Sequence, residues 1–174
     1  MTTTQKTMNF AKYFSTDLVN GPGVRATLFV TGCSHGCKGC FNSGIWNPNT
    51  GLPFTQEMED TIIADLQDEV VARSGLSLLG GDPLFRKNLP AIIKLIKRVK
   101  AETTKTVWLW TGYTMAELQA DDSFLEVLES CDVIIDGRFE LAKADTSLKF
   151  RGSSNQQIWK KDEDAGLCAF IRSI

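Results

Sequence analysis

The sequence predicts an α/β fold in which parallel β/α repeats form a partial (incomplete) TIM-type barrel, in a single domain. Two observations predict it. Short apolar segments alternate with amphipathic ones, and strands that are apolar throughout are typical of a parallel sheet covered on both faces. The chain has 174 residues, whereas a complete eight-stranded barrel needs about 250. The length therefore indicates an incomplete barrel or an open sheet.

The strands are expected where short apolar runs end in glycine, proline or polar residues. They lie at 24–30, 76–79, 106–110 and 132–136, and 167–171 is either a last strand or a buried terminal segment. Between the first two strands, Thr55 is a suitable N-cap for a helix over about 55–73. Apolar residues recur there every four positions, at Met58, Ile62, Leu66 and Val70.

The next two helices have recognisable starts. Asn88 precedes Pro90, and proline is favoured in the first turn of a helix. Thr114 and Glu117 have the spacing of a capping box, so a third helix is expected to begin there, with an apolar continuation at 124–128. The resulting order of strand, helix, strand, helix, strand, helix, strand predicts right-handed parallel crossovers.

Composition limits the classes of function. Residues 1–8 are polar and are expected to form a flexible N-terminal tail, with the domain at 9–174. Lys and Arg number 19, Asp and Glu 21, and the net charge of −2 argues against nucleic acid as a partner. No apolar run approaches the roughly 20 residues of a membrane span. The N-terminal residues have no apolar signal core, so we expect a cytoplasmic protein.

Three of the five cysteines lie within eight residues, at Cys33, Cys37 and Cys40. An odd number of cysteines without a secretory signal argues against a disulfide scaffold. Short spacings allow one loop to direct several thiolates at a soft metal centre. Cys131 and Cys168 lie beside apolar runs and are expected to be small buried residues.

Three interpretations of this cysteine loop are possible. The first is a four-iron cluster on three thiolates, whose fourth iron is open to a small molecule. The second is a structural zinc, which needs a fourth ligand from His35, Cys131 or Cys168. The third is a coincidence of thiols. The spacing favours the open cluster.

Residues with special chemistry follow each expected strand. The cysteine loop follows the first strand, 80–83 the second, 111–113 the third and 136–138 the fourth. In parallel α/β folds the chemistry takes place at the carboxyl ends of the strands. We therefore expect these four segments to meet in one site.

The cysteine motif, together with five other segments, resembles a known family. The spacing Cys-x3-Cys-x2-Cys after a first strand is similar to that of the radical S-adenosylmethionine enzymes, and more narrowly to the activating proteins of anaerobic (class III) ribonucleotide reductases. The matching segments are 20–25, 33–42, 80–84, 110–114, 132–139 and 149–156. They cover roughly residues 9–160, and their common order makes the resemblance specific.

The resemblance implies an activity and its cofactors. A [4Fe–4S] cluster on Cys33, Cys37 and Cys40 would bind S-adenosylmethionine and cleave it reductively to a 5′-deoxyadenosyl radical. That radical would install a glycyl radical on the anaerobic ribonucleoside-triphosphate reductase. The implied electron donor is a one-electron carrier such as reduced flavodoxin. A homodimer or a complex with the reductase is compatible with this activity.

The resemblance also implies a cofactor-binding set. Backbone carbonyls at the strand end of Gly80 and Gly81 would accept hydrogen bonds from the methionyl ammonium, and polar side chains at later strand ends would meet its carboxylate and ribose. Gly39 stands where many relatives in the superfamily have an aromatic residue, and here the aromatic residue is Phe41. The complete set is Gly39, Cys40, Phe41, Asn42, Gly80, Gly81, Asp82, Thr111, Asp136, Arg138, Ser154 and Asn155.

Two alternatives stay open from the sequence. The first keeps the radical chemistry but changes the target to another glycyl-radical enzyme, of the formate-lyase type. The second is a zinc-binding interaction module without catalysis, which would contain one zinc ion and would not respond to S-adenosylmethionine.

Overall fold

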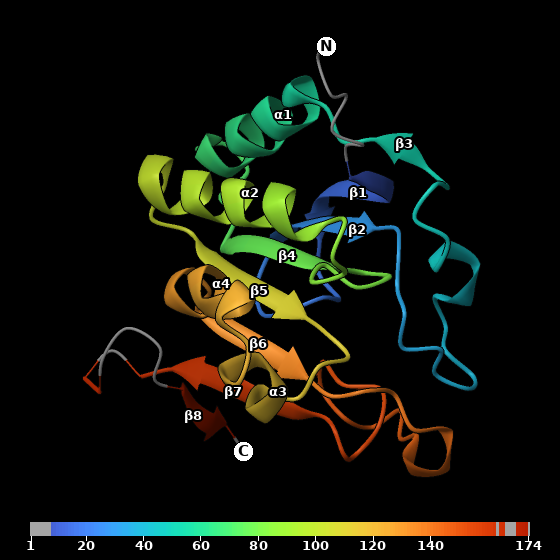
Figure 1. The fold of residues 1–174 in the computed structure, drawn as a ribbon. Helices are drawn as coiled ribbons and strands as arrows, with labels where there is room; N and C mark the ends of the chain where they lie inside the picture. The colour runs from blue at the N-terminus through green and yellow to red at the C-terminus, as the bar shows by residue number, and fades with distance from the viewer. Residues whose placement is uncertain (1–7, 163, 166–169, 174) are drawn as a thin grey trace.

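A sheet of eight strands organises the computed structural model, which describes residues 8–162, 164–165 and 170–173 (Figure 1). The strands are β1 (Asn9–Asp17), β2 (Arg25–Val30), β3 (Leu52–Pro53), β4 (Gly75–Gly80), β5 (Thr106–Trp110), β6 (Val133–Asp136), β7 (Gln157–Lys161) and β8 (Phe170–Ser173). Their order across the sheet is β3-β1-β2-β4-β5-β6-β7-β8. The central strands β2, β4, β5 and β6 pair in parallel, and the outer strands pair antiparallel.

The four central strands confirm the strands predicted from apolar runs, with bounds that differ by a residue or so. The antiparallel strands β1, β3 and β7 were not predicted. β1 is half-exposed along most of its length and β7 carries no fully buried residue, so neither shows the apolar run of a central strand. The sheet is therefore mixed at its edges, and the partial barrel itself stays a prediction.

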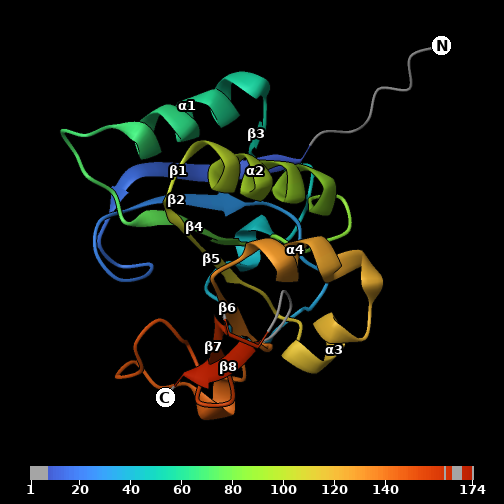
Figure 2. The same cartoon turned by 90° about the vertical axis from the view of Figure 1, so that its left-hand side faces the viewer.

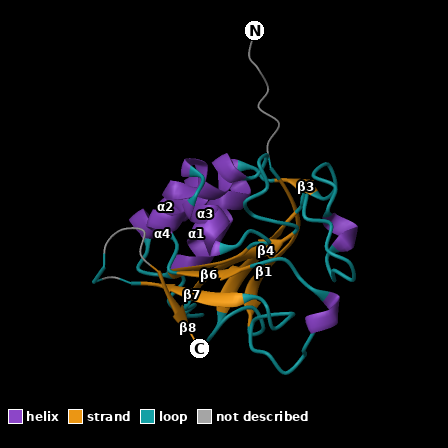
Figure 3. Cartoon of the chain, turned by 60° about the horizontal axis from the view of Figure 1, so that its bottom comes forward, coloured by secondary structure: helices purple, strands orange, loops and turns teal. Residues whose placement is uncertain are grey.

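The helices α1 (Gln56–Gln67), α2 (Leu89–Glu102), α3 (Met115–Gln119) and α4 (Leu125–Ser130) lie on one face of the sheet (Figures 2 and 3). Short 3-10 turns occur at Ser43–Ile45, Asp122–Phe124 and Leu141–Lys143. Thr114 and Glu117 form the predicted capping box at the start of α3. The core between helices and sheet includes Leu28, Leu78, Ile62, Ile92 and Ile96, all with 0% exposure. Burial of these aliphatic side chains stabilises the layered packing.

Helix α1 is shorter than predicted, and this is a correction. The prediction of 55–73 included Val70 in the apolar stripe, but α1 ends at Gln67 and Val70 is 94% exposed. The carboxylate of Asp68 accepts hydrogen bonds from the backbone N–H groups of Val70, at 2.8 Å, and Val71, at 3.4 Å. An aspartate that bonds to nearby amides offers the chain a turn in place of the next helical turn.

The described chain begins with a buried residue. Met8, which was assigned to the tail, is 1% exposed, and its carbonyl accepts a hydrogen bond from Phe54. The remainder of the predicted tail, residues 1–7, lies outside the described residues, as do residues 167–169 of the last predicted segment. Within the described ranges, no helix is long and apolar enough to cross a membrane.

Arg25 joins three strands at their amino ends. The side chain is fully buried, and its guanidinium donates to Ser77 Oγ at 2.7 Å and to the carbonyl of Leu76 at 2.8 Å. It also donates to the hydroxyl and the carbonyl of Thr106, and lies 5.4 Å from the ring centroid of Trp108. These contacts hold β2, β4 and β5 together at one edge. The loops at the opposite, carboxyl edge form the site described next.

Candidate functional site

A cavity of about 320 Å³ opens at the carboxyl ends of the parallel strands. Gly80 ends β4, Trp110 ends β5, Gly137 follows β6, and the cysteine loop follows β2. The predicted site residues that line it are Cys33, Cys37, Cys40, Phe41, Asn42, Gly80, Gly81 and Thr111. The structure thus brings together the cysteine loop and the ends of β4 and β5, as the sequence predicted.

The cysteine loop is held by backbone hydrogen bonds. The amides of Gly32 and Cys33 donate to the carbonyls of Ile45 and Trp46, at 2.9 and 3.0 Å. The amide of Asn42 donates to Cys40 Sγ at 3.4 Å. All three cysteines of the loop are half-buried free thiols. The loop therefore presents its sulfurs from a defined backbone.

Burial raises the pKa of the Cys33 thiol to about 11, and a hydrogen bond from the backbone of His35 partly opposes this rise. Metals bind the thiolate, so a metal centre at Cys33 must displace the thiol proton.

Gly81 allows β4 and the cysteine loop to approach closely. Its amide donates to the carbonyl of Val30, and the amide of Asp82 donates to the carbonyl of Gly32 at 2.8 Å. A Cβ atom at position 81 would lie 2.4 Å from the carbonyl oxygen of Gly32. Only glycine fits this contact without displacing the backbone.

The Asp82 carboxylate does not line the cavity, although it was predicted to bind the cofactor. It is buried, and it accepts hydrogen bonds from His35 Nε2 at 2.6 Å, from Thr111 Oγ1 at 3.0 Å, and from the amides of Gly112 at 3.0 Å and Leu84 at 2.8 Å. The side chain connects the loops that surround the cavity. Its observed contacts are therefore structural.

Asp136 and Arg138 are also engaged away from the cavity lining. The Asp136 carboxylate accepts from the amide of Met115 at 2.7 Å and from that of Gln157 at 3.0 Å. Arg138 forms an ion pair with Glu117 through two hydrogen bonds of 3.1 and 3.2 Å. This pair is the main reason that the pKa of Glu117 is lowered to about 2. Both residues join the start of α3 to neighbouring segments.

Gly39, Ser154 and Asn155 complete the predicted residues that do not line the cavity. Gly39 is exposed and lies against Leu141. Ser154 is exposed, and its amide donates to the carbonyl of Lys143. Asn155 donates to the carbonyl of Arg138 at 2.8 Å. The contact between Gly39 and Leu141 and the hydrogen bond from Asn155 to Arg138 order the loops around the cavity.

An aromatic wall, made of Trp110, Phe139 and Phe150, was not predicted to line the cavity. Phe139 and Phe150 lie inside segments that resemble the family. In those segments the polar residues, and not the aromatic ones, were predicted to bind the cofactor because of their chemistry. Phe150 has φ +61°, a conformation that is rare for a bulky residue. Gln156, from the same segment as Phe150, also lines the cavity. Membership of a matching segment was the signal that could have found these residues.

The residues present fit a cluster bound by three thiolates. In the described part of the chain, no three His, Cys, Asp or Glu side chains are grouped to hold a single metal ion. Cys131, one proposed fourth zinc ligand, is fully buried in the core, as predicted, and does not line the cavity. His35, another proposed fourth ligand, lines the cavity, and its Nε2 is engaged by Asp82. Cys168 lies outside the described residues. The three soft sulfurs that line the cavity suit an iron–sulfur centre.

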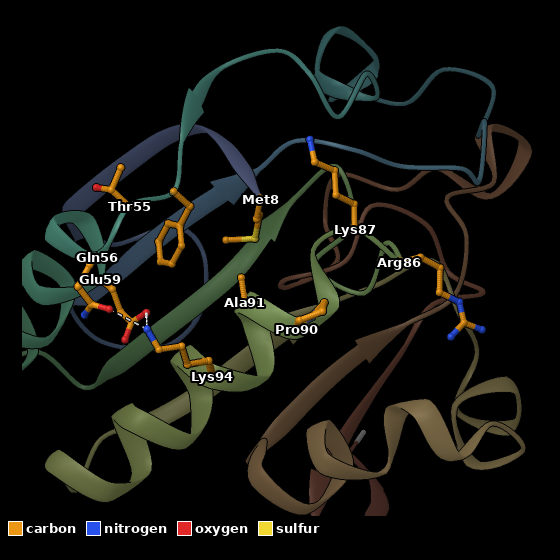
Figure 4. Close-up of a pocket in the computed structure, with 10 residues that line it drawn as sticks. Met8, Thr55, Gln56, Glu59, Arg86, Lys87, Pro90, Ala91 and Lys94 are labelled. Atoms are coloured by element: carbon orange, nitrogen blue, oxygen red, sulfur yellow. Dashed lines mark hydrogen bonds and ion pairs between the residues drawn. The ribbon is translucent and has the colours of Figure 1, made fainter. Parts of the chain in front are cut away.

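A larger cavity, of about 500 Å³, lies between the start of α1 and α2 (Figure 4). None of the predicted site residues line it. Its charged groups have partners: Lys94 bonds to Glu59 at 3.0 Å and to Gln56 at 2.8 Å, and Arg86 pairs with Asp121. The cysteine cavity therefore remains the candidate site.

Comparison with known proteins identifies the class of this site. The family model described as a 4Fe-4S single cluster domain matches residues 19–159. The fold and the three-cysteine cavity thus belong to a 4Fe–4S single cluster domain, which favours the cluster over the zinc alternative.

Curated relatives narrow the family. Anaerobic ribonucleoside-triphosphate reductase-activating proteins are 54% identical in Vibrio cholerae and 49% identical in Escherichia coli K12, in both cases over 87% of this chain and 97% of the relative. The protein of that name from Pasteurella multocida is 51% identical over 88% of this chain and 98% of its own. The chain belongs to the family of anaerobic ribonucleoside-triphosphate reductase-activating proteins.

Proposed function

We propose that this chain activates an anaerobic ribonucleotide reductase by installing a glycyl radical on it. The observation that carries the proposal is that Cys33, Cys37 and Cys40 all line one cavity at the carboxyl ends of β4 and β5. The names of the relatives support the reductase as the target, in preference to a glycyl-radical enzyme of the formate-lyase type.

In this proposal the three cysteines hold a [4Fe–4S] cluster and leave one iron open to S-adenosylmethionine. When bound, the reduced cluster and S-adenosylmethionine supply the one-electron cleavage that generates a 5′-deoxyadenosyl radical. The chain's own contribution is to position these groups. Gly80 and Gly81 present backbone at the cavity, where their carbonyls would accept hydrogen bonds from the methionyl ammonium. The hydroxyl of Thr111 lies at the same edge.

The aromatic wall has a separate role in this proposal. Trp110, Phe139 and Phe150 line the same cavity as the cysteines. Apolar walls exclude water, and a dry site protects a reactive intermediate from side reactions. We assign to these rings the task of limiting access to the reacting atoms while the glycine of the reductase is bound.

The polar residues predicted around the cofactor have a revised place in the proposal. In the proposal, Asp82, Asp136 and Arg138 position the backbone segments that they join. Residues that line the cavity make the contacts with the ribose and the carboxylate of S-adenosylmethionine. Asn42 supplies a side-chain amide there, whereas the amide of Gln156 is engaged by Gly137, Gly152 and Ser153. The cofactor set that we propose is therefore smaller than the set predicted from the sequence.

Electron paramagnetic resonance tests this proposal directly. The protein is reconstituted anaerobically with iron and sulfide, reduced, and measured with and without S-adenosylmethionine. We expect a [4Fe–4S]⁺ signal that changes when S-adenosylmethionine is added. Mixing with the reductase and a one-electron donor such as reduced flavodoxin should then produce a glycyl radical signal on the reductase. A cluster signal that is insensitive to S-adenosylmethionine would contradict the mechanism, and a radical formed only on a formate-lyase-type partner would contradict the target.

A further inference from the structure

The only histidine of the chain lies within the cysteine loop, between Cys33 and Cys37, where it forms a hydrogen bond with a buried carboxylate. His35 Nε2 is 2.6 Å from Asp82 Oδ2. We propose that this His35–Asp82 pair is a positioning latch that holds the cysteine loop on the ends of β4 and β5 before any cluster is bound. The proposed function gives the latch its purpose, but the latch itself is a property of the metal-free chain.

The contacts of Asp82 Oδ2 fix the direction of this hydrogen bond. The same oxygen accepts from Thr111 Oγ1 and from the amide of Gly112, each at 3.0 Å. A carboxylate only accepts hydrogen bonds, so the Nε2 atom of His35 carries the proton in this pair. Asp82 follows β4, Thr111 and Gly112 follow β5, and His35 belongs to the cysteine loop. One carboxylate oxygen therefore joins three segments that are distant in the sequence.

Burial makes this junction strong. The side chains of His35 and Asp82 are 5% and 2% exposed. A buried carboxylate that loses a donor cannot replace it with bulk water, and hydrogen bonds to charged groups are the ones whose loss is most costly. The loop therefore has a strong preference for the position in which His35 reaches Asp82.

The neighbours of the imidazole form a slot for it. A Cβ atom at Gly112 would lie 2.3 Å from the ring, so the absence of a side chain there creates the space. The ring of Tyr113 meets that of His35 edge to face, with centroids 4.7 Å apart. Position and orientation of the imidazole are thus set by packing as well as by the hydrogen bond.

A latch at this position affects all three thiols. His35 is two residues from both Cys33 and Cys37, so fixing its ring limits the movement of the chain on both sides. Gly32, Gly36 and Gly39 all have positive φ, and glycine-rich segments lose much conformational entropy when they become ordered. Ordering the loop in advance lowers the cost of assembling the cluster.

Hydrogen–deuterium exchange of the full chain without cluster tests the latch. The variant His35→Gln places an amide N–H near the position of imidazole Nε2, whereas the shorter His35→Asn does not reach Asp82. In His35→Asn we expect the amides of 33–42 to exchange about tenfold faster or more, because opening no longer breaks the charged hydrogen bond. In His35→Gln we expect rates close to those of the unmodified protein. Ser34→Ala is the matched control, since Ser34 is exposed in the same loop.

Amides of β5 and α2 report global unfolding in the same experiment. Loss of a native hydrogen bond also lowers the free energy of global unfolding, so in His35→Asn these amides should accelerate by no more than the loop amides, and in His35→Gln and Ser34→Ala they should be unchanged. Equal loop exchange in His35→Asn and in the unmodified protein would overturn the latch. Equal acceleration of loop exchange in His35→Asn and His35→Gln would also overturn it. That result would indicate a general packing defect, because only the glutamine side chain is long enough to reach Asp82.

Cluster content gives a second measurement. After reconstitution with iron and sulfide, we expect His35→Asn to bind less iron per chain than His35→Gln and Ser34→Ala, and to lose it faster to a chelator. Neither measurement uses S-adenosylmethionine or the reductase. If the latch fails while the cofactor still changes the resonance signal, the proposed function stands. If the latch holds but the signal is insensitive to the cofactor, only the proposed function fails.

Discussion

The indole of Trp110 donates a hydrogen bond from Nε1 to the carbonyl oxygen of Phe150, at 2.7 Å. This contact ties the end of β5 to a loop forty residues later in the chain. The ring of Phe150 packs edge to face on Trp108, with centroids 5.3 Å apart. Together these contacts hold Phe150 at φ +61°, in the wall of the cysteine cavity. The strained backbone persists because both its carbonyl and its ring are engaged.

This strain can be measured by comparing two truncations. Phe150→Ala and Phe150→Gly both remove the ring, but only glycine adopts a positive φ without a penalty. We expect Phe150→Gly to be more stable than Phe150→Ala by about 0.5–1 kcal/mol, the reverse of the usual order. Urea unfolding of the two variants measures the difference. A more stable alanine variant would show that the left-handed conformation carries no strain.

Gly81→Ala is expected to disturb the cysteine loop. The new Cβ atom would lie 2.4 Å from the carbonyl oxygen of Gly32, so the backbone of one strand end or the other must move. We expect a loss of about 2 kcal/mol or more in the free energy of unfolding, together with lower iron content after reconstitution. Gly44→Ala is the control, because a Cβ atom there meets nothing within 4 Å. A similar result for both variants would contradict the close-approach argument.

The assignment of the cluster ligands predicts a contrast between two cysteines. Cys37 lines the cavity, whereas Cys131 is fully buried in the core. We expect Cys37→Ala to lose most of its iron after reconstitution and Cys131→Ala to keep it. Iron and sulfide analysis, with the absorbance of the cluster, measures the contrast. Equal iron content in both variants would refute the assignment.

Arg25→Met is expected to lower the free energy of unfolding by about 3 kcal/mol. The substitution leaves two buried acceptors, Ser77 Oγ and the carbonyl of Leu76, without their donor, and unsatisfied buried polar groups cost about 1–3 kcal/mol each. Arg86→Met is the control. Arg86 is 63% exposed where it pairs with Asp121, so its loss should cost less than about 1 kcal/mol. Comparable losses in denaturant unfolding would mean that the Arg25 network is dispensable.

The Arg138–Glu117 pair predicts a pH dependence of stability. In the folded protein the pKa of Glu117 is lowered to about 2 from its ordinary 4.5, first of all by the hydrogen bond from Arg138. A lowered pKa stabilises the folded state above about pH 4.5, and this contribution fades as the pH falls toward 2. Both side chains are more than 40% exposed, so we expect no more than about 1 kcal/mol.

Urea unfolding of Glu117→Gln beside the unmodified protein, from pH 7 to pH 3, measures this contribution. The difference between the two proteins should be constant near neutral pH and should shrink below about pH 4.5. A difference that grows as the pH falls would contradict the sign of the shift.

The sequence by itself determined the central strands, the starts of the helices and the cysteine motif. These features are local: an apolar run, a cap residue or a cysteine spacing is complete within a few neighbouring residues. In the structure, Cys33, Cys37 and Cys40 line one cavity at the expected strand ends. The outer strands β1 and β7 escaped prediction because they are half-exposed and lack a local apolar signal.

Only the tertiary structure decided what the polar residues around the cavity do. The chemistry of Asp82, Asp136 and Arg138 suits cofactor groups, but each is satisfied by partners that the sequence places far away, such as His35 for Asp82 and Glu117 for Arg138. A carboxylate or guanidinium binds the groups that the fold positions beside it, and burial makes the hydrogen bonds of Asp82 and Asp136 costly to break. That positioning depends on strand order and loop packing, which no local pattern encodes.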